Sequence, residues 1–251
     1  MQGPELSIVI PSYNEEKRLP RTLARIREYF TSRPLAGDQL EVIVVDDGST
    51  DGTANVAREW QVQWPSVRLV SNNGNCGKGY SVRHGMLEAR GRIALFTDAD
   101  LSSPIEECEK LFDALKAGND VAIGSRALDR SLISARQSKV RESAGIIFNM
   151  LVRLFTWLPF HDTQCGFKIF MREKSHAVWE QQRIRGWGFD PEVLFLAKRH
   201  GLKIAEVPVR WAHDDATKVH VVRDSVIMFV DLVYIRLNWL IGRYPTRRSE
   251  K

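Results

Sequence analysis

The chain has 251 residues, enough to bury a full hydrophobic core in one large domain. Its composition, 43% hydrophobic and 27% charged, is that of a globular protein and excludes a disordered or low-complexity chain. The net charge of +5 favours anionic partners such as nucleotides, phospholipid surfaces or nucleic acid. The three scattered cysteines lack Cys-x-x-Cys spacing and indicate neither a zinc site nor a disulfide framework.

Short apolar runs alternate with helical patterns through the first half of the chain. We predict strands over Leu6–Ile10, Leu40–Val45, Val67–Val70, Ile93–Thr97 and Val121–Ile123. The intervening helices are predicted over Glu15–Phe30, Thr53–Trp60, Lys78–Ala89 and Pro104–Ala117. This alternation predicts an α/β fold with a mostly parallel central sheet and helices on both faces.

The second half is less regular. A polar, basic loop is expected over Ser125–Arg141, then an amphipathic helix over Ser143–Leu158, a turn-rich segment over Asp162–Lys168, and a helix and strand ending at Trp211. A last helix is expected over Val222–Arg243. Its polar residues Asp224, Asp231 and Asn238 recur every seven positions, opposite an apolar stripe of Val226, Val230, Val233, Leu237 and Leu240.

The two amphipathic stretches allow two interpretations. Their apolar stripes can pack on the core or lie in a membrane interface. No uninterrupted apolar run reaches the roughly 18–20 residues of a membrane span, and the N-terminus has no signal-peptide pattern. We expect a catalytic domain over residues 1–215 and an amphipathic, membrane-associating segment over residues 216–251.

Two carboxylates follow the apolar run Ile93–Thr97. Asp98 and Asp100 would lie at the carboxyl end of that strand, where open α/β sheets bind ligands. Such a pair needs a cation, and the usual one is a divalent metal shared between carboxylate and phosphate oxygens. The sequence here indicates an enzyme that uses a nucleotide diphosphate.

Two further turns carry ligand-binding chemistry. Asp46 and Asp47 lie at the end of a predicted strand, before a glycine turn. A carboxylate there can accept a hydrogen bond from a base N–H or a ribose hydroxyl. Ser49–Asp51 have an alternative interpretation, because they are ordinary helix-capping residues. Lys78 lies in a glycine-rich turn before a helix and could meet a phosphate. That turn is neither a P-loop nor a dinucleotide fingerprint, because Gly79 follows the lysine and Val82 replaces the last glycine.

These motifs occur in a familiar order. SIVIPSYNEE, VIVVDDGSTDGT, NCGKG, TDADLSSP, GSR, DTQCGFK and WGFDPEVL resemble those of family 2 glycosyltransferases with the GT-A fold. The resemblance extends from Leu6 to about Arg243. Within the family the chain is most similar to polyprenyl-phosphate sugar transferases of the dolichyl-phosphate β-glucosyltransferase type, to which DTQCGFK points most narrowly.

The resemblance implies roles for particular residues. The nucleotide would be bound by Pro11, Tyr13, Glu15, Asp46, Asp47, Lys78 and Asp98. Asp98 and Asp100 would coordinate Mg²⁺ or Mn²⁺; Ser102 stands where related mannosyl synthases often have a glutamine ligand, so water is expected there. The acceptor phosphate would be bound by Arg126, Arg141 and Lys218, and the sugar by Asp162 and Gln164. The catalytic residues would be Asp100, Asp190 and Arg126.

The resemblance also implies a reaction. We expect metal-dependent, inverting transfer of glucose from UDP-glucose to a polyprenyl or dolichyl phosphate, at the cytoplasmic face of a membrane. A phosphate acceptor is already ionised, so a general base is largely dispensable. Asp190 is then expected to orient the sugar or the cationic loop, or to begin a helix with Pro191 at its first position.

Other functions stay open. The donor could be GDP-mannose or UDP-GlcNAc, and the acceptor could be a glycan or protein hydroxyl, with Asp190 as the base. A sugar-1-phosphate nucleotidyltransferase is disfavoured, because PSYNEE replaces the glycine-rich basic loop of such enzymes. A non-catalytic membrane or nucleic-acid binding protein is disfavoured by the Asp98–Asp100 pair and by basic residues that share no periodic face.

Overall fold

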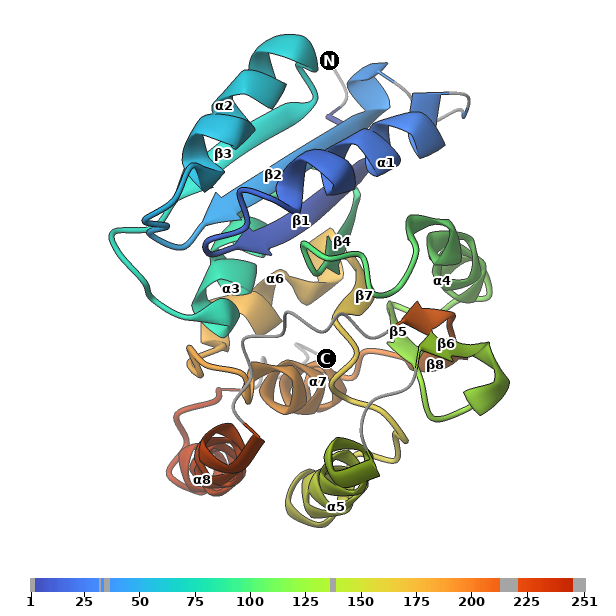
Figure 1. The fold of residues 1–251 in the computed structure, drawn as a ribbon. Helices are drawn as coiled ribbons and strands as arrows, with labels where there is room; N and C mark the ends of the chain where they lie inside the picture. Colours follow the sequence, from blue (N-terminus) through green and yellow to red (C-terminus); the bar gives the residue numbers. More distant parts are fainter. Residues whose placement is uncertain (1–2, 32, 34–36, 136–138, 213–220, 246–251) are drawn as a thin grey trace.

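A seven-stranded sheet forms the centre of the molecule in the computed structural model (Figure 1), which describes residues 3–245 except 32, 34–36, 136–138 and 213–220. The strand order is β3-β2-β1-β4-β7-β5-β8. The strands are β1 (Leu6–Ser12), β2 (Leu40–Asp46), β3 (Val67–Ser71), β4 (Ile93–Thr97), β5 (Val121–Ser125), β7 (Phe167–Met171) and β8 (Ile204–Pro208). A separate small sheet pairs β6 (Ile133–Ala135) with β9 (Trp211–Ala212).

Helices cover both faces of the sheet, which confirms the predicted α/β class. One core lies under α1 (Leu19–Thr31), α2 (Thr53–Gln63) and α4 (Cys108–Lys116). The other lies under α3 (Lys78–Glu88), α5 (Lys139–Thr156), α6 (Arg172–Gln181), α7 (Phe189–Arg199) and α8 (Val221–Leu240). Successive side chains of β1 point to opposite faces of the sheet, as in any strand. Ile8 and Ile10 therefore face the first core and Val9 faces the second.

Strand β7 interrupts the parallel order that the sequence predicts. It runs antiparallel between β4 and β5, whereas β1–β4 are mutually parallel and β5 is parallel to β8. The amino end of β7 therefore meets the carboxyl ends of its neighbours. The backbone N–H of Asp98, just after β4, donates to the carbonyl of Gly166, just before β7, at 3.2 Å.

Several predicted boundaries are wrong. Helix α1 begins at Leu19 rather than Glu15, because the backbone N–H groups of Asn14 and Glu15 donate to side chains of the loop after β2. The segment expected as one loop, Ser125–Arg141, contains a short 3₁₀ helix (Arg130–Leu132), β6 and the start of α5. The single helix expected before the strand near Trp211 is two helices, α6 and α7.

Helix α8 presents its apolar stripe outward. Val226, Val230, Leu237 and Leu240 are exposed, whereas Asp224 and Asn238 of the seven-residue polar row are buried. Asp231, in the same row, accepts a hydrogen bond from the backbone of Gly188 at the start of α7. The polar row thus faces the protein. No helix within the described part of the chain is long and apolar enough to cross a membrane.

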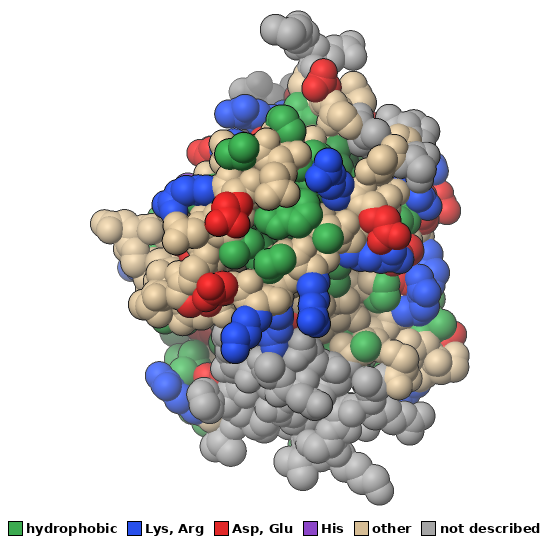
Figure 2. Space-filling view, turned by 45° about the horizontal axis from the view of Figure 1, so that its top comes forward, with side chains coloured by type: hydrophobic (Ala, Val, Ile, Leu, Met, Phe, Trp, Pro, Cys, Tyr) green, Lys and Arg blue, Asp and Glu red, His purple; other side chains and the backbone are tan. Residues whose placement is uncertain are grey.

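The coloured, described part of the face turned toward the viewer in Figure 2 carries no extended surface of one charge. Lys and Arg side chains there are interspersed with Asp and Glu around a central group of hydrophobic side chains. Nucleic-acid binding surfaces are dominated by one sign of charge. This face therefore lacks that feature.

The docking of α8 should depend on pH through Asp231. Burial raises the pKa of Asp231 to about 6, and the Gly188 hydrogen bond offsets only part of this rise. The folded state therefore favours the protonated form of Asp231. The stability that this preference contributes is fully present below about pH 4 and is lost as pH rises through about 6. Asp231→Asn should raise the free energy of unfolding by about 1 kcal/mol at pH 8, a value reduced for partial exposure. Urea unfolding at pH 8 and pH 4 measures the difference, which should shrink at pH 4.

Asp113→Asn is the matched control, because Asp113 is an exposed aspartate on α4. Its substitution should not reproduce the pH dependence of Asp231→Asn. A loss of stability in Asp231→Asn at pH 8 would show that the ionised carboxylate holds α8 in place.

Candidate active site

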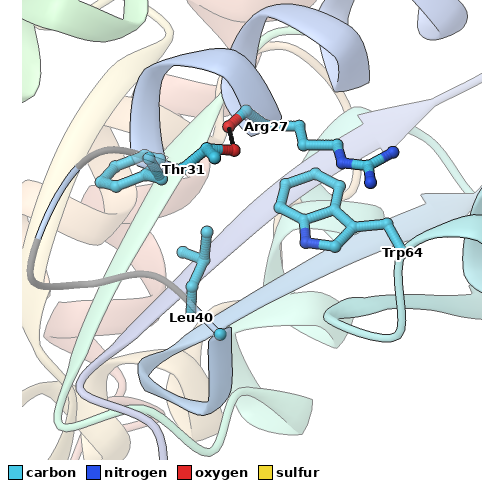
Figure 3. Close-up of a pocket in the computed structure, with 6 residues that line it drawn as sticks. Arg27, Thr31, Leu40 and Trp64 are labelled. Atoms are coloured by element: carbon cyan, nitrogen blue, oxygen red, sulfur yellow. Dashed lines mark hydrogen bonds between the residues drawn. The ribbon is translucent and has the colours of Figure 1, made fainter.

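The candidate site lies where the carboxyl ends of β1, β2 and β4 meet the amino end of β7. Strand β1 pairs with β2 on one side and with β4 on the other. Strands β2 and β3 are added on one side of β1, and the next strand, β4, is added on the opposite side. Ligands of open α/β sheets bind in the crevice at such a reversal. A hollow of about 220 Å³ near Leu40, at the amino end of β2, lies at the opposite edge and is excluded from this site (Figure 3).

The loops after β1 and β2 are bound to each other. The backbone N–H of Thr50 donates to Asn14 Oδ1 at 2.8 Å. The backbone N–H of Asn14 donates to Ser49 Oγ at 2.9 Å. The N–H of Glu15 donates to Thr53 Oγ1 at 2.7 Å. Asn14 adopts a positive φ of 52°, a costly conformation for a residue other than glycine. Capping is therefore only part of the role of Ser49–Asp51, because Ser49 and Thr50 also connect their loop to the loop after β1.

Asp47 holds the glycine turn that carries Lys78. Its Oδ1 accepts from Cys76 N at 2.9 Å and Asn72 Nδ2 at 2.7 Å, and its Oδ2 accepts from Gly77 N at 2.9 Å. Gly77 has a φ of 97°, and a Cβ there would lie 2.4 Å from the carbonyl oxygen of Arg185. Asp47 thus fixes the turn from within. A direct contact with nucleotide stays a prediction for it.

The other predicted nucleotide residues surround the same crevice. Asp46 is buried and accepts from Ser49 N at 3.2 Å. Glu15 forms an ion pair with Arg18 at 3.1 Å. Pro11, within β1, and Tyr13, just after it, are half-buried. These residues occupy the ends of β1 and β2, on either side of the strand reversal.

Lys78 lies against the Asp98–Asp100 pair. Its Nζ is 2.6 Å from Asp98 Oδ1 and 4.9 Å from the ring centre of Trp187. Burial lowers the pKa of Lys78, but Asp98, Asp190 and Asp100 together raise it further, so its net pKa is above the usual value. Desolvation and the neighbouring charge of Asp98 raise the pKa of Asp100. Lys78 is therefore a permanent cation in an acidic crevice.

The carboxylate pair suits a hard divalent cation but supplies few ligands. Asp100 Oδ1 accepts a hydrogen bond from Ser102 N at 2.9 Å. A Cβ at Gly166 would lie 2.1 Å from Asp98 Oδ2, so only glycine leaves room for this carboxylate. Across the described ranges, no group of three His, Cys, Asp or Glu side chains could hold a metal. A cation here would need diphosphate and water oxygens as well.

A second buried ion pair lies behind the first. Lys168 Nζ contacts Asp190 Oδ1 at 2.6 Å and donates to the carbonyl of Cys165, and Lys168 is fully buried. Burial raises the pKa of Asp190, while Lys168 and Lys78 counteract the rise. Pro191 is the third residue of α7, not the first as expected. Sequence reasoning missed Lys168, although a lysine inside the apolar strand FKIFM is a signal, since buried lysines are nearly always paired.

Arg126 is fixed by Asp162. The guanidinium donates through Nε at 2.6 Å and Nη2 at 2.8 Å, and the backbone N–H donates at 3.0 Å. Burial raises the pKa of Asp162, but Arg126 lowers it by more, to about 2. Asp162 N in turn donates to Glu206 on β8 at 2.8 Å. One predicted acceptor residue is thus bound to one predicted sugar residue.

The remaining predicted residues differ in what the structure says of them. Gln164 lies two residues after Asp162 and donates its N–H to Asp162 Oδ1 at 3.1 Å, while its buried Nε2 has no hydrogen-bond partner within the described ranges. Such an orphaned donor is available to a ligand hydroxyl. Arg141 lies within α5, but its side chain is outside the description, and Lys218 lies outside the described residues.

Comparisons with known proteins show the family of the chain. Residues 7–179 match the family model described as Glycosyl transferase family 2. Dolichyl-phosphate beta-glucosyltransferases from Saccharomyces cerevisiae and Homo sapiens are each 36% identical over 261 residues. These alignments cover 97% and 98% of this chain and 78% and 79% of the respective relatives.

Solved structures share the fold. Mannosyl-3-phosphoglycerate synthase from Rubrobacter xylanophilus gives a TM-score of 0.68 at 20% identity, covering 98% of this chain and 78% of that one. Glucosyl-3-phosphoglycerate synthase from Mycobacterium tuberculosis, in complex with Mn²⁺, uridine-diphosphate and glucosyl-3-phosphoglycerate, gives 0.64 at 20% identity, covering 98% and 82%. At this identity the likeness concerns the fold alone.

The fold and the family match define a glycosyltransferase. The chain belongs to glycosyl transferase family 2, which confirms the resemblance found in its motifs. The relatives that it matches over nearly its whole length are named dolichyl-phosphate beta-glucosyltransferase.

The Lys168–Asp190 pair should matter strongly for stability. Lys168→Met leaves the buried Asp190 carboxylate without its cation and should lower the free energy of unfolding by roughly 3–5 kcal/mol. The double variant Lys168→Met/Asp190→Leu should recover much of that loss, because no buried charge is left unpaired. Urea unfolding of both variants at neutral pH measures the coupling.

Lys174→Met is the control, because Lys174 also pairs with an aspartate, Asp120, but its side chain is 59% exposed. Its substitution should change stability by no more than about 1 kcal/mol. Equal losses in Lys168→Met and Lys174→Met would contradict the buried-pair argument.

Proposed function

We propose that the protein transfers glucose from UDP-glucose to dolichyl phosphate or a related polyprenyl phosphate, with inversion at the anomeric carbon. The supporting observation is the meeting of the Asp98–Asp100 pair, Lys78 and the Arg126–Asp162 pair at one edge of the sheet. The names of the full-length relatives support the same acceptor and sugar.

The donor would bind in the crevice between β1, β2 and β4. Pro11, Tyr13, Glu15, Asp46 and Asp47 would surround the uridine, partly through the mutually bound loops. Lys78 would turn from Asp98 toward the diphosphate and supply a fixed positive charge to the leaving group. Asp98 and Asp100 would hold Mg²⁺ or Mn²⁺, which when bound supplies Lewis-acid stabilisation of the departing diphosphate.

The acceptor would approach from the β5–β7 side. Arg126 would present its guanidinium to the acceptor phosphate, with Arg141 and Lys218 as further cations, while Asp162 and Gln164 would contact the sugar. Because Asp162 accepts from Nε and Nη2 of Arg126, the guanidinium is held in a fixed orientation, and Nη1 would be the group that donates to the phosphate. An ionised phosphate oxygen attacks without a base, so Asp190 would position Lys168 and Lys78 instead of accepting a proton.

The exposed faces of α5 and α8 support attachment to a membrane, where a polyprenyl phosphate resides. The two helices pack against each other and lie side by side at the bottom of Figure 1. Their exposed apolar side chains are Ile146, Ile147, Met150, Leu154, Trp157, Val226, Ile227, Phe229, Val230, Leu237, Leu240 and Ile241. Contiguous apolar surface of this kind marks an interaction site. We propose peripheral attachment at the cytoplasmic face, with residues 1–215 as the catalytic domain and residues 216–251 as an attachment segment.

Donor binding should require a divalent metal. Asp98→Asn and Asp100→Asn should each weaken Mn²⁺-dependent UDP binding at least ten-fold, because each removes a charged oxygen ligand. Calorimetric titration with UDP, with Mn²⁺ or with chelator, measures this. Asp113→Asn, on the exposed side of α4, should bind as the unaltered chain does. UDP binding that persists in chelator would contradict the metal assignment.

The acceptor site should depend on Arg126. Arg126→Ala should raise the KM for a short polyprenyl phosphate about 10- to 100-fold, as expected for loss of a charge-assisted hydrogen bond. UDP binding should stay unchanged, and Arg126→Lys should recover part of the loss because it keeps the charge. Steady-state transfer from UDP-glucose, with product mass analysis, provides the measurement. Arg130→Ala, in the same loop, is the control, and an unchanged KM in Arg126→Ala would overturn the assignment.

A further inference from the structure

A second cationic cavity lies between α5, α7 and α8, away from the Asp98–Asp100 edge. It has a volume of about 450 Å³ and is lined by Thr156, Trp157, Phe195, Lys198, Arg199, Arg236 and Trp239. Asp190 and Arg199 lie at opposite ends of α7, about 13 Å apart at ~1.5 Å per residue. The cavity is therefore separate from the site described above.

The lining has three cations and no acid. Neither Lys198, Arg199 nor Arg236 forms an ion pair with a carboxylate in the described part of the molecule. Lys198 and Arg199 end α7, where basic residues complement the helix dipole, and this accounts for their presence without a ligand. Arg236 lies before the last turn of α8, which carries no basic residue, and has no such explanation.

Arg236 is held in place by aromatic rings and not by an anion. Its guanidinium carbon lies 3.6 Å from the ring centre of Trp157 and 4.8 Å from that of Trp239. Its Nη1 is buried and has no hydrogen-bond partner among the residues that the structure describes. Burial lowers the pKa of Arg236. A pre-oriented guanidinium with free N–H groups is a ready site for a phosphate.

The rim of the cavity is apolar. Trp157, in the lining, is 64% exposed, and Leu154 and Leu240, on the same helix ends as lining residues, are 67% and 68% exposed. Trp157 follows the end of α5 with a φ of 56°, a conformation that costs free energy and places this ring beside Arg236. Tryptophan and arginine side by side are typical of proteins at the headgroup level of a bilayer. The anion that enters this cavity thus arrives with an apolar tail.

We propose that this cavity binds the phosphate headgroup of an anionic membrane phospholipid, with Arg199 and Arg236 as the principal contacts. The site rests on the membrane attachment proposed above and gives that attachment a preference for anionic lipid. It is distinct from the acceptor site, because it lies at the other end of α7 and shares no residue with it.

Vesicle co-sedimentation of the full chain tests the site. The vesicles contain phosphatidylcholine alone or phosphatidylcholine with phosphatidylglycerol. The double variant Arg199→Gln/Arg236→Gln should lose about 100-fold of the preference for phosphatidylglycerol, because each charge-assisted hydrogen bond to the phosphate contributes about ten-fold. Arg153→Gln/Arg223→Gln removes two exposed arginines from α5 and α8 outside the cavity and should lose far less. Equal losses in the two double variants would overturn the site in favour of diffuse attraction.

Further arms separate the proposals. Binding to phosphatidylcholine alone tests attachment. Leu154→Gln/Leu240→Gln should weaken this binding at least ten-fold, while Val62→Gln, at a still more exposed apolar residue on α2, should not. Saturation of the cavity by free glycerol phosphate at the lipid's own concentration, followed by tryptophan fluorescence, would overturn a lipid source. If Arg199→Gln/Arg236→Gln fails to fold, Arg199→Gln alone should show about a ten-fold loss, and no loss would overturn the proposal.

Discussion

The antiparallel strand β7 is the constraint on which the site depends. Because β7 runs against β4 and β5, the segment that precedes it reaches the same edge as the carboxyl ends of β1, β2 and β4. Asp162, Gln164 and Gly166 arrive there from a part of the chain more than 60 residues after Asp98. A wholly parallel sheet would place this segment at the opposite edge, and Arg126 would lose its carboxylate partner.

The strand also brings a charge into the core. Lys168, the second residue of β7, pairs with Asp190, while Lys78 pairs with Asp98 on the solvent side. Two lysines and the carboxylates Asp98, Asp100 and Asp190 therefore lie in one continuous cluster. A cluster with more carboxylates than cations repels further anions, so a diphosphate needs additional positive charge to enter. The arrangement itself favours a divalent cation as part of the donor site, although only two carboxylates are available to hold it.

Local sequence was sufficient for the strands that carry the donor motifs. Leu6–Ser12, Leu40–Asp46 and Ile93–Thr97 are apolar runs bounded by turn residues, and each ends within two residues of its predicted position. The local sequence could not predict the direction of β7, because the direction of a strand is set by its pairing with other strands of the sheet. The Arg126–Asp162 pair likewise depends on β7, and nothing in the spacing of these two residues indicates a contact. The sequence could have predicted that Lys168 has a charged partner, since a charge inside an apolar strand requires one.

Helix α8 shows why periodicity alone could not assign a face. Its pattern has one polar row and one apolar stripe, and the usual rule turns the stripe toward the core. Here the polar row faces inward, with Asn238 buried near Tyr244 and Asp231 at the start of α7. The helix still buries Leu232 and Ile235, so it is anchored to the protein by a narrow apolar seam and polar contacts. The broad stripe is then left exposed, as the proposed attachment to a membrane requires.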